Sequence, residues 1–128
     1  MLIKYQRNAL LWAFFIFCIC AMPSSGFPRI KISSIIGTDK FAHAFVYLIL
    51  YIMMYLGLRK YNKVKQYIPF DTNWIWAVFA CFIFGVIIEI LQGNFFNRGM
   101  EFLDVVANSF GIFLGVISTR IFFRNKLS

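Results

Sequence analysis

The sequence is short of charge, and of acidic residues above all. Charged residues make up 14% of the 128-residue chain, and five Asp and Glu stand against thirteen Lys and Arg. Soluble domains are about 25% charged and roughly 45–50% apolar, whereas this chain is 61% apolar, with a mean hydropathy of +0.74. Seventeen Phe residues cannot all be hidden inside a chain of 15.0 kDa. The composition therefore excludes an ordinary soluble domain and indicates an integral membrane protein.

Cysteine and histidine are scarce too, which limits metal and redox chemistry. The three cysteines, Cys18, Cys20 and Cys81, lie in apolar stretches without a CxxC pair, so we expect packed or lipid-facing thiols. His43 is the only histidine, which excludes a three-histidine zinc site within one chain. A mixed site of histidine and carboxylates stays open, although the sequence assigns no metal and leaves any cofactor unknown. Its candidate ligands are Asp39, His43, Glu89 and Asp104.

Four apolar stretches are long enough to cross a bilayer. A hydrocarbon core of ~30 Å needs about 20 mostly apolar helical residues, with about 17–25 tolerated. The stretches lie at residues 8–28, 40–58, 72–92 and 102–120. We therefore predict one domain over residues 1–128, an all-α bundle of four transmembrane helices. The first stretch could be a cleaved signal peptide, but no small-x-small cleavage site follows Met22, which favours an uncleaved anchor.

The basic residues are unevenly distributed between the two ends of these helices. With the N-terminus inside, nine Lys and Arg residues fall on the inner side and four on the outer side. The positive-inside rule favours this orientation, so we predict that both termini are cytoplasmic. The basic run at residues 59–65 is then interpreted as an inner loop held against anionic lipid headgroups, and nucleic acid is not expected as a partner.

Four of the five acidic residues lie at the opposite, outer end, where topology does not require them. Residues three or four apart share a helix face, and by this spacing three of the helices each carry a polar stripe toward that end. Ionisable residues in a span usually face a bundle interior or a water-filled cavity. The stripes consist of Asp39, Lys40, His43 and Tyr47 on the second helix, Glu89 and Gln92 on the third, and Asp104 and Asn108 on the fourth, with Arg98 in the loop between the last two.

Structural roles compete with functional ones for each of these residues. Asp39 and Asp104 could cap their helices, and Asn108 could be a buried hydrogen-bonding partner between helices. Gly111 and Gly115 could form a close-packing face on the fourth helix. His43 and Glu89 lie deeper than caps need to lie, which favours a functional role for these two.

The same residues resemble motifs of the VanZ-like family of membrane proteins. The stretch from Asp39 to Tyr47 is similar to its DK-x-x-H-x-x-x-Y element, Glu89 begins an E-x-x-Q element, and Asp104 begins a D-x-x-x-N-x-x-G element. The elements occur in the family's order over residues 38–115. One departure is the Phe-Asn-Arg-Gly-Met sequence around Arg98, where a Gly-Arg or Pro-x-Arg approach is expected, so the geometry of that loop is expected to differ.

The resemblance implies a bacterial cytoplasmic-membrane protein of the cell envelope, in a family named for a protein that confers low-level teicoplanin resistance. A site at the outer face would act on, or bind, a lipid-linked or amphiphilic envelope component. His43 could serve there as a general base. The alternatives are binding without chemistry and a structural bundle that forms homo-oligomers or binds a partner, so enzymatic activity stays open. The candidates are His43, Glu89, Asp39 and Asp104 for catalysis, and Lys40, Tyr47, Gln92, Arg98 and Asn108 for ligand binding.

Overall fold

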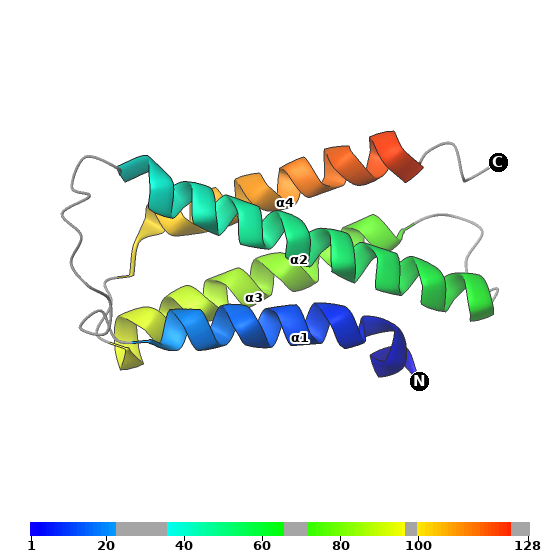
Figure 1. Ribbon diagram of the computed structural model, residues 1–128, viewed down its shortest axis with the longest axis horizontal. Coiled ribbons are helices and arrows are strands. Elements are labelled where there is room, and N and C mark those ends of the chain that lie inside the picture. Colours follow the sequence, from blue (N-terminus) through cyan, green and yellow to red (C-terminus); the bar gives the residue numbers. More distant parts are fainter. Residues whose placement is uncertain (23–35, 66–71, 97–99, 124–128) are drawn as a thin grey trace.

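The computed structural model describes residues 1–22, 36–65, 72–96 and 100–123, with backbone alone at residues 36–39, 65 and 123. Four helices follow one another up and down along the bundle, so that Met1 and the end of the last helix lie at the same end (Figure 1). All four are long and apolar enough to cross a membrane, which confirms the predicted all-α four-helix architecture. The helices are α1 (Leu2–Ala21), α2 (Ile36–Lys65), α3 (Asn73–Phe95) and α4 (Phe102–Phe123).

Two helices differ in extent from the apolar stretches that predict them. Helix α1 begins at Leu2 rather than near residue 8, and it ends at Ala21. The next residue, Met22, is extended (φ −69°, ψ 127°), because the residue before a proline is disfavoured in the helical region and Pro23 follows. The rest of the first predicted stretch, residues 23–28, lies outside the described residues.

Helix α2 continues through the basic run at residues 59–65. The interpretation of this run as a loop is therefore wrong. Arg and Lys are good helix formers, and neither Gly nor Pro interrupts the sequence between Leu58 and Lys65. Hydropathy marks where a helix leaves the hydrocarbon, but it does not mark where the helix ends.

The outer surface of the described helices is largely apolar. A water-soluble bundle would bury its large apolar side chains, so the exposed ones on this surface indicate contact with lipid. The inward-facing core is small by comparison and is rich in tyrosine, with Tyr47, Tyr51 and Tyr55 all buried. Exposed phenylalanines occur on all four helices and include Phe14, Phe41, Phe79, Phe102 and Phe122.

Helix α2 is the central element, because it contacts each of the other three helices, and α4 most extensively. Two small residues of α4 permit this approach. A Cβ atom at Gly111 would collide with the backbone carbonyl of Ala44, and one at Gly115 would lie 2.5 Å from the ring of Tyr51. Gly111 and Gly115 therefore do form a close-packing face, and it brings the backbones of α2 and α4 together.

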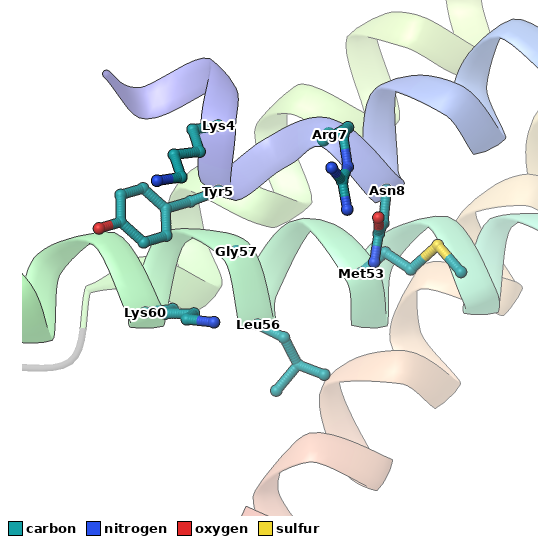
Figure 2. Close-up of a pocket in the computed structure, with 8 residues that line it drawn as sticks. All are labelled: Lys4, Tyr5, Arg7, Asn8, Met53, Leu56, Gly57 and Lys60. Atoms are coloured by element: carbon teal, nitrogen blue, oxygen red, sulfur yellow. The ribbon is translucent and has the colours of Figure 1, made fainter.

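The end of the bundle that holds Met1 is basic. A cavity of about 370 Å³ lies there between α1 and α2, as Figure 2 shows. Lys4 and Arg7 from α1 and Lys60 from α2 contribute three cationic side chains to its lining. Hydrogen bonds deeper in the bundle also join these helices, from the Gln6 side-chain amide to the Met54 carbonyl (3.2 Å) and from the Trp12 indole to the Val46 carbonyl (3.0 Å).

The close approach at Gly111 makes a test of the packing. In Gly111→Ala, the added methyl group meets backbone, which cannot rotate away as a side chain can. Overpacking costs about 1–3 kcal/mol, whereas alanine gains about 1 kcal/mol over glycine in helix propensity. We expect the variant to unfold at a lower temperature in detergent. Ile117→Ala, on the exposed surface of the same helix, should change the unfolding temperature much less. Equal or higher stability of Gly111→Ala would show that α2 and α4 do not touch there.

Candidate functional site

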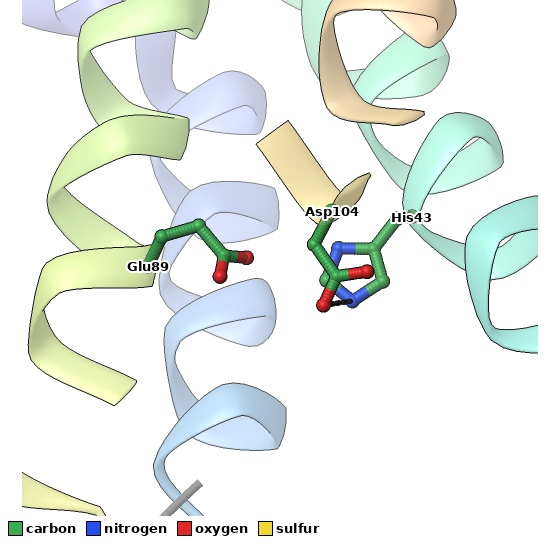
Figure 3. A group of neighbouring side chains, drawn as sticks. All are labelled: His43, Glu89 and Asp104. Carbon is green, nitrogen blue, oxygen red and sulfur yellow. Dashed lines mark ion pairs between the residues drawn. The ribbon is translucent and has the colours of Figure 1, made fainter. Parts of the chain in front are cut away.

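Three helices bring their polar side chains together at the end of the bundle opposite Met1. His43 lies at the end of the first turn of the membrane-spanning part of α2, Glu89 lies toward the end of α3, and Asp104 lies in the first turn of α4. One ligating atom from each of the three lies within 4.8 Å of the others. Figure 3 shows the Glu89 carboxylate directed toward the pair formed by His43 and Asp104. The grouping that helical spacing predicts for these three residues is present.

Lys40 joins α2 to the start of α4 by two ion pairs. Its ammonium contacts Oδ1 of Asp104, and it lies 2.6 Å from Oε2 of Glu101. The Asp104 side chain is only 10% exposed, whereas that of Glu101 is 60% exposed. The pair with Glu101 is open to solvent and contributes little, while the pair with Asp104 neutralises a carboxylate that has left water. Lys40 therefore acts as a clamp on Asp104.

His43 is held from both sides of its ring. Its Nδ1 lies 3.0 Å from Oδ1 of Asn108, and its Nε2 lies 3.8 Å from Oδ2 of Asp104. An amide oxygen accepts hydrogen bonds only, so the Nδ1 proton is donated to Asn108. In the neutral ring, Nε2 then carries a lone pair directed toward the carboxylate. This is the orientation that a general base or a metal ligand requires.

Glu89 is the least satisfied member of the cluster. Its side chain is 0% exposed, and neither carboxylate oxygen has a hydrogen-bond partner among the described residues. The ionisable side chains that interact with it are Asp104, His43 and Lys40. The backbone of Glu101 also approaches this carboxylate, without the geometry of a hydrogen bond. A buried polar group with no partner costs about 1–3 kcal/mol, more if it is charged, so the position of Glu89 calls for an explanation.

Gln92 and Tyr47 border the cluster on the side of α1. Both line a small cavity of about 170 Å³ together with His43, and Ile16 and Cys20 of α1 form the opposite wall. Tyr47 lies one turn below His43 and is 1% exposed. It packs beside Phe84 of α3, and its hydroxyl has no hydrogen-bond partner in the described part of the chain. Tyr47 is thus a core residue at the base of the site.

A separate apolar groove lies where α2 meets α4. Its volume is about 400 Å³. Lys40, which belongs to the polar cluster, is the charged residue among its lining side chains. The apolar lining residues are Phe41, Ala44, Leu103, Val106, Ala107 and Phe110. The sequence does not distinguish them from the lipid-facing residues around them, because both groups are hydrophobic and helical.

The predicted site residues divide into three groups. Lys40, His43, Glu89, Asp104 and Asn108 form the cluster, and Gln92 and Tyr47 border it. The Asp39 side chain and all of Arg98 lie outside what the structure describes, so their predicted roles are untested. Glu101 was missed as a site residue, although its spacing of three from Asp104 would have placed it on the same helical turn.

Comparison with known families matches residues 5–123 to the family described as VanZ/LLP1. The match extends beyond the motif-bearing stretch at residues 38–115 and includes most of α1. No curated protein and no solved structure matches the chain.

The clamp on Asp104 can be tested by removing the charge of Lys40. Lys40→Gln leaves a mostly buried carboxylate without its cation, and we expect it to lower the free energy of unfolding by about 1–3 kcal/mol, less than for a fully buried pair because Lys40 is 21% exposed. Thermal unfolding in detergent measures the change. Lys60→Gln removes an exposed cation at the other end of the bundle and should be close to neutral. Equal effects of the two substitutions would contradict the clamp.

Proposed function

Because the chain belongs to the VanZ/LLP1 family, we propose that it is an integral membrane protein that binds, or acts on, a lipid-linked or amphiphilic envelope component. The site of binding is the polar cluster, at the extracytoplasmic face of a bacterial cytoplasmic membrane. An enzyme and a non-catalytic binding protein would use the same site. They would differ only in whether a covalent bond of the ligand is formed or broken.

The observation that carries the proposal is the apolar groove that ends at a charged cluster. The groove between α2 and α4 is lined by aliphatic and aromatic side chains, and it terminates at Lys40 beside Asp104. An acyl or isoprenoid chain fits the apolar part, since its burial there replaces contact with bilayer lipid at little cost. The polar head of the same molecule would then lie beside Lys40, next to Asp104. A bundle held together by polar contacts alone does not require a groove of this volume.

The charge difference between the two ends supports the orientation. Lys4, Arg7 and Lys60 gather at the end that holds Met1, and the carboxylate cluster lies at the other end. The positive-inside rule favours a cytoplasmic basic end, and the cluster would then lie at the outer leaflet. Envelope precursors, and antibiotics that bind them, are exposed in that leaflet. Tolerance to a lipid-tailed glycopeptide would then follow from binding of the amphiphile or of its target.

A structural role is the second candidate, and the ion pair of Lys40 with Asp104 favours it. That pair, with the hydrogen bond between His43 and Asn108, joins α2 to α4 and would hold the helices together without any ligand. Glu89 does not fit this role, because it makes no such contact among the described residues.

The groove makes a testable prediction about co-purified lipid. In Val106→Trp, a large ring fills the groove, and we expect mass spectrometry of the purified protein to show at least one lipid class reduced relative to wild type. Phe113→Trp places the same ring on the exposed surface of α4, outside the groove, and should retain that class. If wild type and both variants carry the same lipids, the groove does not select a ligand.

The orientation has its own test in reporter fusions. Green fluorescent protein fused after residue 128 should fluoresce, and alkaline phosphatase fused there should be inactive, because both report a cytoplasmic C-terminus. The same reporters fused after Met22, beyond the end of α1, should behave in the opposite way. Active phosphatase at residue 128 would place the polar cluster inside the cell and refute a site at the outer leaflet.

A further inference from the structure

The cluster of His43, Glu89 and Asp104 has the donor set of a metal site. It offers one imidazole nitrogen and two carboxylates, all buried or nearly so and from three different helices. Donors bonded to one ion at about 2.0–2.2 Å lie no more than about 4.4 Å apart. Nε2 of His43 and Oδ2 of Asp104 are already 3.8 Å apart, and all three ligating atoms lie within 4.8 Å. Small side-chain rotations would close the remaining gap.

The two oxygens of Glu89 are the independent sign of a missing ligand. They are completely buried, lack a hydrogen-bond partner in the described part of the structure, and point at the other two donors (Figure 3). Three groups with lone pairs facing one another repel unless a cation lies between them. The buried Glu89 carboxylate is directed where such a cation would bind.

The groups around the cluster already position its donors. A histidine that binds metal through one nitrogen normally donates the other ring N–H to an oxygen, and Asn108 provides that oxygen to Nδ1 of His43. Lys40 contacts Oδ1 of Asp104, which leaves Oδ2 directed toward His43. Together the two contacts hold Nε2 of His43 and Oδ2 of Asp104 facing each other. The ion pair of Lys40 with Asp104 alone would not require this orientation.

The charge of the cluster favours a divalent ion. Its two ligand carboxylates, Glu89 and Asp104, carry two negative charges, and the Lys40 ammonium beside Asp104 also pairs with the exposed carboxylate of Glu101. The two ligand charges match the charge of one divalent cation. Mixed imidazole and carboxylate donors suit ions such as Mn²⁺ and Zn²⁺ better than Ca²⁺, which prefers oxygen ligands alone.

We propose that His43, Glu89 and Asp104 bind one divalent transition-metal ion, with Asn108 and Lys40 as positioning residues. The proposal concerns the ion alone and holds whether or not a lipid occupies the neighbouring groove. The competing occupant is a proton shared by His43 and a carboxylate, and metal content distinguishes the two.

The test is metal binding by the full chain in detergent micelles. The protein is stripped with a chelator, equilibrated with Mn²⁺, desalted and measured by elemental analysis and by electron paramagnetic resonance. Mn²⁺ is the probe because it binds carboxylates and imidazole and has little affinity for the three cysteines. We expect about one Mn²⁺ per chain in wild type, and a thermal unfolding temperature that rises when Mn²⁺ is added.

Three variants make the result specific. Glu89→Gln keeps the shape of the side chain and removes a ligand charge, and it should lose the bound Mn²⁺ and the rise in unfolding temperature. Asn108→Ala removes a positioning contact and should weaken binding by roughly 10–100-fold. Glu101→Gln is the matched control: it removes the exposed carboxylate that pairs with Lys40, leaves the three ligands in place, and should keep the bound ion.

Two outcomes would overturn the proposal. Wild-type protein without bound Mn²⁺ and without a change in unfolding temperature would leave the shared proton as the occupant. Equal Mn²⁺ content in wild type and Glu89→Gln would place the ion elsewhere. Since Glu89→Gln is close in shape to wild type, its unfolding temperature without metal shows whether the variant is folded.

Discussion

Hydrocarbon offers no hydrogen-bond partner, so each polar side chain within a membrane span must find one inside the protein. At one end of this bundle, α2 and α4 meet that requirement together. The ammonium of Lys40 contacts Asp104, and the ring of His43 bonds to Asn108, so both contacts run from α2 to α4. The close packing of the two helices at Gly111 makes such short contacts possible. Glu89 is brought to the same place from α3 but finds no hydrogen-bond partner among the described residues. The inference of a metal site depends on this difference between Glu89 and its neighbours.

The sequence predicted the four helices because a span leaves a clear trace in hydropathy. It also predicted the cluster, since helical spacing of three and four places His43, Glu89 and Asp104 at corresponding depths. The prediction from sequence failed where hydropathy carries no information about helix length. The basic run at residues 59–65 is polar, yet it continues α2, because helix propensity and not hydropathy decides where a helix ends. Spacing also could not show that Tyr47 lies too deep to join the cluster, or that Lys40 would pair with Asp104 and Glu101. Those outcomes depend on the separation and rotation of neighbouring helices.

The two ends of the bundle are chemically different, and the proposed orientation in the membrane depends on this difference. The basic end, with Lys4, Arg7 and Lys60 around a shared cavity, is suited to the headgroup region of an anionic leaflet. The other end has carboxylates and a single histidine beside an apolar groove. Between them lies a core of tyrosines and small residues, surrounded by phenylalanines that face outward. Such a protein has little interior of its own, so a ligand of the kind proposed would reach the cluster along the helix surface and not through a channel in the bundle.

The central claim is that the cluster is a binding site and not a set of contacts that holds the helices together. The most direct test is the stability of Glu89→Met in detergent with a chelator present. In a binding site without its ligand, an unsatisfied buried carboxylate lowers the free energy of unfolding. Replacing that carboxylate by an apolar side chain of similar size should therefore raise the free energy of unfolding, by about 1–3 kcal/mol. A fall in stability of the same size would show that Glu89 supports the bundle, and would contradict the account.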